Sequence, residues 1–321
     1  MFFNTNHYIK VFMDTLHKSK KYAGDHAEAA KYYDVRTMDE LAKQHVDREG
    51  SFLIRVTGED SYQAARSLKK QGASDVLVLN FANSISQGGG VRVGARAQEE
   101  DLCRTSTLYN SLISQEAFPF YDYNRKNDKN ESGSDTAIYS PHVFIIKDEK
   151  YHDIAPVEVS VVTMAAPINE PGIHAAEILD QRIYKLLCLA ESIGHKKLVL
   201  GAWGCGAFGN DPQEVAELFR DNLKKFDCFE EVVFAVRMVA GRDERNYPDA
   251  IPNTVTDMIK KQILGDENLR ELINQLDHHR PPRIFVMGRT GVGKSSLINA
   301  LCGMYVAEVS AVDIGTKETV S

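Results

Sequence analysis

Three consecutive glycines and two adjacent carboxylates lie close together in the first third of the sequence. They are Gly88, Gly89 and Gly90, followed after seven residues by Gln98, Glu99 and Glu100. Because glycine lacks Cβ, such a turn can adopt positive φ and let the backbone approach a ligand closely. Its successive N–H groups can bind phosphate oxygens. A run of glycines alone is more often only a flexible turn, but the carboxylates that follow make this segment a candidate site for a phosphorylated ligand.

The two carboxylates are expected to have separate roles. Gln98 begins a segment with the pattern of a helix. Its apolar face includes Leu102, Leu108 and Leu112. Adjacent helical residues point about 100° apart, so Glu99 and Glu100 cannot stand on opposite sides of one glycosidic bond, as the paired carboxylates of many glycosidases do. One would hold a sugar and the other would transfer a proton.

Each glutamate also has a plainer interpretation, since acidic residues in a first helical turn simply complement the helix dipole. The same dipole lowers the pKa of a carboxyl group, whereas a general acid needs that pKa raised. The neighbouring carboxylate of Glu99 and the phosphates of a ligand would raise the pKa of Glu100.

A second glycine-rich loop, GCGAFG at residues 204–209, lies between an apolar run and a helix predicted to begin at Asp211-Pro212. It has the form G-x-G-x-x-G, but the dinucleotide fingerprint also needs an acidic residue about twenty positions further on. Here the next apolar run ends Arg237-Met238-Val239 instead. NAD binding is therefore disfavoured, whereas an anion site at a helix N-terminus remains the prediction.

A third pattern, G-x-x-x-x-G-K-S, occupies residues 288–295, after the apolar run RIFVM and before the helical pattern KSSLINAL. Strand, loop and helix in this order are typical of a P-loop. The predicted GTP-binding residues are Gly288, Gly291, Gly293, Lys294, Ser295 and Ser296. In a P-loop the lysine reaches the β- and γ-phosphates and the serine binds Mg²⁺.

The elements that must position these residues are short Val/Leu-rich strands alternating with amphipathic helices. The predicted strands are 75–82, 159–166, 196–203 and 231–238, and the clearest helix is 174–194, with Gly194 as its C-terminal stop. Nearly continuous apolar strands indicate a sheet covered on both faces, so the alternation predicts a three-layer α/β domain.

The remaining segments have weaker signals. Residues 1–50 have a helical, charge-mixed pattern, and the polar segment 124–136 predicts a mobile surface insertion. Trp203 is expected in the core. Tyr121 and Tyr123 are expected to pack in a loop, and stacking on a base is the less favoured alternative.

Composition narrows the class of protein. A net charge of -7 disfavours broad nucleic-acid or anionic-membrane binding, although a local cluster of Arg92, Arg96 and Arg104 could bind an anionic ligand. Five scattered cysteines without a CxxC pair indicate reduced thiols and no zinc site. The sequence has no signal-peptide or membrane-span pattern, so a cytoplasmic protein is expected.

The GGG and QEE motifs and their flanks resemble the bacterial-type poly(ADP-ribose) glycohydrolases. The resemblance extends from about residue 10 to 250. It includes VLNFAN before the glycines, IYSPHVFIIKDE at 138–149, VVTMAAP at 161–167 and LGAWGCGAFGNDP at 200–212. It implies a macrodomain-like fold with a three-layer mixed sheet. It also implies hydrolysis of ribose–ribose bonds in ADP-ribose polymers or on ADP-ribosylated proteins, with no cofactor or metal.

The resemblance also implies residue roles. Glu100 would be the catalytic acid, and Glu99 and Asn83 would hold the ribose. The second glycine loop would cradle the diphosphate, with Phe208 packed on the ligand. The implied substrate-binding set is Asn83, Gly88, Gly89, Gly90, Gln98, Gly204, Cys205, Gly206, Ala207 and Phe208.

GRTGVGKSSLINALCG resembles the Era-like GTPases, with Thr316 or Thr319 as the switch threonine. We therefore divide the chain into a glycohydrolase domain at 1–252, a helical linker at 253–282 and the first strand, P-loop and helix of a GTPase domain at 283–321. About forty residues are too few for such a domain, so we expect a longer parent chain, with GTP and Mg²⁺ bound only in a complete domain. Two alternatives stay open: a macrodomain that binds ADP-ribose without cleaving it, and a GTP-dependent switch with a regulatory macrodomain.

Overall fold

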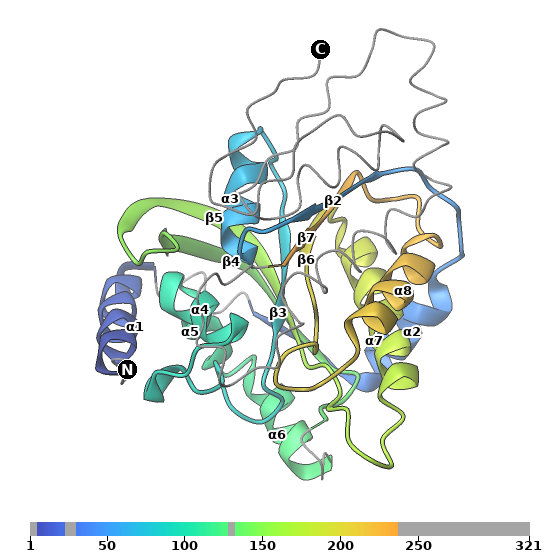
Figure 1. Ribbon diagram of the computed structural model, residues 1–321, viewed down its shortest axis with the longest axis horizontal. Coiled ribbons are helices and arrows are strands. Elements are labelled where there is room, and N and C mark those ends of the chain that lie inside the picture. The colour runs from blue at the N-terminus through green and yellow to red at the C-terminus, as the bar shows by residue number, and fades with distance from the viewer. Residues whose placement is uncertain (1–4, 23–29, 128–131, 237–321) are drawn as a thin grey trace, which may run out of the picture.

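The structure is a computed structural model that describes residues 5–22, 30–127 and 132–236. A seven-stranded mixed sheet runs through this part of the chain, with helices on both faces (Figure 1). The strands are β1 (Lys31–Tyr33), β2 (Leu53–Thr57), β3 (Leu77–Phe81), β4 (Ala137–Lys147), β5 (Asp153–Met164), β6 (Lys197–Leu200) and β7 (Glu231–Ala235). Their order is β1-β4-β5-β3-β6-β7-β2, with β1 and β4 antiparallel to their neighbours and all other pairs parallel.

Two layers of helices cover the sheet. One layer contains α1 (Thr5–Ser19), α3 (Ser61–Lys70), α4 (Gln98–Thr105), α5 (Leu108–Leu112) and α6 (Phe118–Asn127), and the other contains α2 (Val35–Gln44), α7 (Ala175–Ile193) and α8 (Pro212–Leu223). Short 3₁₀ turns lie at η1 (Lys20–Tyr22) and η3 (Val91–Val93). Figure 1 shows α1, α4 and α5 on one side of the sheet and α2, α7 and α8 on the other.

Along the central strand β3, successive side chains point alternately into the two cores, and this explains why its sequence is almost wholly apolar. Leu77 and Leu79 belong to the core beneath α7 and α8, whereas Val78 belongs to the core beneath α3 and α4. Both faces of β3 are buried, so successive residues all need apolar side chains. The four predicted strands and the three-layer architecture are confirmed. So is the long helix, which ends at Gly194 with φ of 89°.

Two expectations about helices were wrong in detail. Residues 1–50 are not all helical, because 31–33 form the edge strand β1. The helix that begins at Gln98 stops at Thr105, and a second helix starts at Leu108. The chain turns there because Thr107 exchanges two hydrogen bonds with the backbone of Phe144 on β4, at 3.0 Å each.

The segment 124–136 is not simply a mobile insertion. Its first four residues complete α6, and Asn124 is fully buried. Residues 132–135 are fastened by Arg182 of α7, whose guanidinium donates to Ser132 O at 2.6 Å, to Gly133 O at 2.9 Å and to the Asp135 carboxylate at 3.0 Å. Tyr121 and Tyr123 were expected in a loop, but both lie in α6, where Tyr121 is fully buried and Tyr123 is exposed.

The carboxyl ends of the parallel strands define one edge of the sheet. Loops 82–97, 165–174 and 201–211 follow β3, β5 and β6, which are adjacent in the sheet. Binding sites of open α/β sheets form at such an edge. Both glycine-rich motifs of the first 250 residues lie in these loops. The predicted P-loop lies outside the described residues.

Candidate active site

Glu99 is held in the interior by donors from the end of β3 and the loop after it. Its Oε2 accepts a hydrogen bond from Asn83 N at 2.8 Å, and its Oε1 accepts one from Asn80 Nδ2 at 3.2 Å. Burial raises the pKa of Glu99 to about 8, and the neighbouring Glu100 carboxylate adds to that shift, while the donors Asn83 and Asn80 oppose it. The Glu99 carboxyl therefore keeps its proton to a higher pH than an exposed glutamate does.

Glu100 is bonded at both oxygens to backbone N–H groups. Its Oε1 accepts from Gly90 N at 2.8 Å and its Oε2 from Ala97 N at 2.9 Å. The second of these bonds closes the first turn of α4. Both glutamates are buried, with 7% of Glu100 and 3% of Glu99 exposed.

The glycine turn brings both carboxylates to one place. A Cβ on Gly89 would lie 2.5 Å from Glu100 Oε1 and 3.1 Å from Glu99 Oε2. Gly88 and Gly89 have φ of 67° and 56°, a conformation that other residues rarely adopt. The carboxyl groups of Glu99 and Glu100 thus lie close together beside Gly89, although adjacent helical residues point in different directions. Separate roles are compatible with this arrangement, but they do not follow from divergence of the carboxyl groups.

Gln98 uses its whole amide group within the protein, whereas Asn83 uses only its amide oxygen there. The Gln98 amide donates to Leu79 O at 2.8 Å and to Ser61 Oγ at 3.1 Å, and accepts from Phe81 N at 2.9 Å. Gln98 therefore fastens α4 to the end of β3. Asn83 accepts from Ser86 N at 2.8 Å through its amide oxygen. Within the described residues, the Asn83 amide nitrogen has no protein acceptor.

The second loop has a different hydrogen-bonding pattern. Gly204 has φ of 76°, and a Cβ there would lie 2.4 Å from Asn210 Nδ2. Asn210 ties this turn to the β5 loop by donating to Pro167 O at 2.8 Å. Within the part of the chain that the structure describes, the N–H groups of Gly206, Ala207 and Phe208 donate to no protein acceptor. These three donors remain available for an anion, whereas the N-terminus of α8 is capped by the Asp211 carboxylate.

Trp203 and Phe208 are the aromatic residues of this loop, and the prediction is confirmed for Trp203 only. Trp203 is fully buried in the core, as expected. Phe208 and Cys205 are half-buried at the margin of the same core, and their ligand contacts stay predictions.

Sequence reasoning missed Asn80, Arg182 and Asn210, which are all buried and position these loops. Asn80 is the only polar residue in its strand, and Arg182 interrupts the apolar face of α7. A lone polar side chain within an apolar pattern is the signal that could have identified both, because a buried polar group needs a hydrogen-bond partner.

The predicted arginine cluster is only partly available to a ligand. Arg104 is fully buried, donating to Ala95 O at 2.6 Å and pairing with Asp101 at 3.1 Å. It holds the loop between the two motifs and cannot reach an external anion. Arg92 and Arg96 are exposed.

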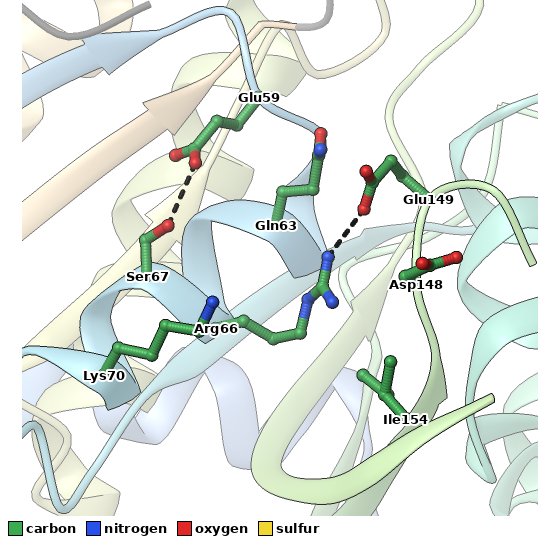
Figure 2. Close-up of a pocket in the computed structure, with 8 residues that line it drawn as sticks. All are labelled: Glu59, Gln63, Arg66, Ser67, Lys70, Asp148, Glu149 and Ile154. Carbon is green, nitrogen blue, oxygen red and sulfur yellow. Dashed lines mark hydrogen bonds and ion pairs between the residues drawn. The ribbon is translucent and has the colours of Figure 1, made fainter. Parts of the chain in front are cut away.

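A separate hollow of about 340 Å³ lies between α3 and the turn after β4 (Figure 2). Its lining includes the carboxylates of Glu59, Asp148 and Glu149, with Arg66 paired to Glu149 at 2.8 Å. A lining richer in acids than in unpaired cations does not suit a diphosphate, so this hollow is not the predicted site.

Two carboxylates, a glycine turn with positive φ and a loop with open N–H groups thus lie at the carboxyl ends of adjacent parallel strands. The family model described as the microbial-type poly(ADP-ribose) glycohydrolase catalytic domain matches residues 5–148. The structure is similar to the poly(ADP-ribose) glycohydrolase of Thermomonospora curvata, with a TM-score of 0.71 and 30% identity over 80% of this chain and 99% of that one. It is also similar to the Deinococcus radiodurans glycohydrolase in complex with ADP-ribose, with a TM-score of 0.65 and 34% identity over 74% and 94% of the chains.

The chain belongs to the microbial-type poly(ADP-ribose) glycohydrolase family, a family of glycoside hydrolases. Residues 283–321 match the model described as 50S ribosome-binding GTPase. Two uncharacterised proteins of Escherichia coli (strain K12), YfjP and YkfA, are 48% and 50% identical over 52 residues. The chain spans 18% of the length of these curated relatives. Among the described helices, none has the length and apolar character to cross a membrane.

Proposed function

We propose that the chain hydrolyses the ribose–ribose O-glycosidic bonds of poly(ADP-ribose) and releases ADP-ribose, with Glu100 as general acid. The observation that carries this proposal is the convergence of Glu99 and Glu100 on Gly89, at the same sheet edge as the open loop 204–209. The similar Deinococcus enzyme in complex with ADP-ribose supports the choice of ligand.

In the proposed reaction, Glu100 donates its proton to the 2′-oxygen that leaves as the bond to the anomeric carbon breaks. A water then bonds to the positively charged anomeric carbon and returns a proton to Glu100, so the acid is regenerated. Glu100 suits this role because both oxygens of its carboxyl group are fixed beside the glycine turn by backbone N–H groups. The Gly90 and Ala97 N–H groups stabilise its anion between the two proton transfers.

Glu99 holds the sugar in this proposal. In its protonated form, which its raised pKa favours, it can donate a hydrogen bond to a ribose hydroxyl. The amide nitrogen of Asn83 provides a second donor beside it. Both groups are fixed by the backbone around them, which limits the entropy lost on binding.

The diphosphate would bind at loop 204–209. The N–H groups of Gly206, Ala207 and Phe208 supply directed donors. Phe208 would pack on the ligand. The proposed reaction uses only carboxyl and N–H groups of this chain, and none of its steps needs a metal.

The direct test is release of ADP-ribose from labelled poly(ADP-ribose) by the purified chain. The alternative of a non-cleaving binding module predicts tight ADP-ribose binding without release. Binding is therefore measured by calorimetry in parallel with cleavage. Affinity in the micromolar range together with no release after prolonged incubation would favour the binding module.

We further propose that residues 283–321 contribute to a GTP-binding domain. Lys294 would contact the β- and γ-phosphates, Ser295 would bind Mg²⁺, and Gly288, Gly291, Gly293 and Ser296 would shape the loop. The match to a GTPase family model supports this assignment. Lys294→Ala in the full chain should leave release of ADP-ribose unchanged if the two activities are independent. A large loss of release would favour the GTP-dependent switch.

A further inference from the structure

The segment between the two motifs is fixed beside the proposed acid. Residues 90 and 97 at its two ends donate their N–H groups to the two oxygens of Glu100. Within it, Ala95 N donates to Gly90 O at 3.1 Å, and Ala95 O accepts from the buried Arg104 at 2.6 Å. This rim segment, residues 90–97, is therefore a rigid border of the site on the side of Glu100.

Arg92 extends from the rim segment and is held by an uncharged partner. Its Nε donates to Tyr109 Oη at 2.6 Å, and its guanidinium lies 5.5 Å from the centre of that ring. Tyr109 is itself buried and fixed against Phe12 of α1, with ring centroids 4.9 Å apart. In the described part of the chain Arg92 forms no ion pair with a carboxylate. Its exposed positive charge is thus oriented but not neutralised.

Arg96 extends from the same segment and stacks on α1. Its guanidinium lies 4.7 Å from the centre of the Tyr8 ring, and the residue is exposed. Stacking on an aromatic face fixes the plane of an arginine. Arg92 and Arg96 therefore place two oriented guanidinium groups along the border next to Glu100.

The chemical structure of poly(ADP-ribose) indicates which part of the substrate would lie next to the rim segment. A general acid lies within hydrogen-bond reach of the leaving oxygen, so the polymer that leaves begins next to Glu100 and crosses the rim segment. The leaving oxygen belongs to the ribose of the next repeat, which carries its own diphosphate. Arginine is well suited to phosphate because its planar N–H groups can bind two oxygens at once.

We propose that Arg92 and Arg96 form a subsite for the diphosphate of the leaving repeat, which makes the chain favour polymer over shorter ligands. This inference rests on the proposed glycohydrolase function. It assigns the two arginines to substrate binding only, since neither touches the carboxylates that perform the chemistry. The subsite is absent from the contacts of free ADP-ribose, which has no second repeat.

The test compares the double variant R92Q/R96Q with the wild-type chain. KM for long poly(ADP-ribose) should rise about 10-fold, as expected for losing charge-assisted hydrogen bonds, with kcat nearly unchanged. The affinity for free ADP-ribose, measured by calorimetry, should stay within about twofold. The wild-type KM should rise with NaCl concentration, and this salt dependence should be weaker in the variant.

Two controls make the result specific. Lys43→Gln removes one exposed charge from α2 in the opposite helical layer and should leave KM unchanged. R92K/R96K keeps both charges and should recover most of the affinity for polymer. An unchanged KM in R92Q/R96Q, or an equal loss of affinity for free ADP-ribose, would overturn the subsite. If the wild-type chain releases no ADP-ribose at all, the failure lies with the proposed function instead.

Discussion

The two glycine-rich loops at the carboxyl ends of the parallel strands use their backbone N–H groups in opposite ways. In the first loop, Gly90 N binds Glu100 and Gly89 N donates to Ser86 O at 3.0 Å. In the second, three consecutive N–H groups from Gly206 to Phe208 have no protein acceptor within the described residues. The first loop organises the carboxylates, and the second is open to a ligand.

This difference shows that glycine serves two separate physical purposes here. At Gly89 a side chain would collide with the Glu100 carboxylate, so glycine is required by the protein itself. At Gly206 a Cβ would meet no atom of the described residues within 4 Å, which leaves space beside it for a ligand. The expectation that the GGG turn also binds phosphate stays a prediction, but the open N–H groups favour the second loop for that role.

The largest effect is expected at Glu100. A substitution that removes the Glu100 proton donor should lower the rate of ADP-ribose release about 10³-fold, which is a usual contribution of a general acid. Because both carboxylate oxygens accept from N–H groups, Glu100→Gln would place its NH₂ against one of these donors. Glu100→Ala is therefore the matched second variant. Both should retain ADP-ribose binding by calorimetry, and wild-type release by either one would show that Glu100 is not the acid.

The next largest effects should distinguish the roles of the two loops. Gly89→Ala should lower kcat about 100-fold by displacing the carboxylates, since misplacement of catalytic groups by about 1 Å has such a cost. Gly206→Val should instead weaken ADP-ribose binding about 10-fold and leave folding unchanged. Steady-state kinetics and calorimetry on both variants test the contrast. Equal effects of the two changes on kcat would contradict the proposed division between loops.

A smaller effect is expected at Phe208. Phe208→Ala removes ring contact with the ligand worth about 1–1.5 kcal/mol, or roughly a 10-fold loss of ADP-ribose affinity. Phe208→Leu should retain part of that affinity. Calorimetry on both variants measures the loss, and unchanged affinity in Phe208→Ala would mean that the ring does not contact the ligand.

The smallest effect concerns the pH dependence of stability. The pKa of Glu99 is raised from 4.5 to about 8 in the folded chain, so the folded state keeps a proton that the unfolded state loses over this range. Stability from this group is therefore fully present below pH 4.5 and is lost as pH rises through about 8. Glu99→Gln should remove that loss.

The Glu99→Gln variant is structurally compatible with its surroundings. Asn80 Oδ1 is buried without a partner in the described part of the chain, and a flip of that amide would let it accept from the new NH₂ group. The Tm of the variant relative to wild type should be several degrees higher at pH 8.5 than at pH 5, because 1 kcal/mol corresponds to roughly 2–4 °C in a domain of this size. Equal differences at both pH values would show that Glu99 does not titrate in this range.

Much of the fold could be predicted because its signals are local. The apolar runs that became β3, β5, β6 and β7 need only short stretches of sequence to be recognised, and Gly194 ends α7 as its position predicts. The edge strand β1 and the break between α4 and α5 were missed because both depend on pairing with β4, which is distant in sequence.

By itself, the sequence determined the residue types, the two glycine motifs and the order of strands and helices that brings them to one edge. Only the tertiary structure decided which polar groups remain available there. Arg104 and Arg92 have the same side chain in neighbouring motifs, yet the first is buried and paired and the second faces solvent. Burial and hydrogen-bond pairing are set by partners distant in the chain, so no local pattern can specify them.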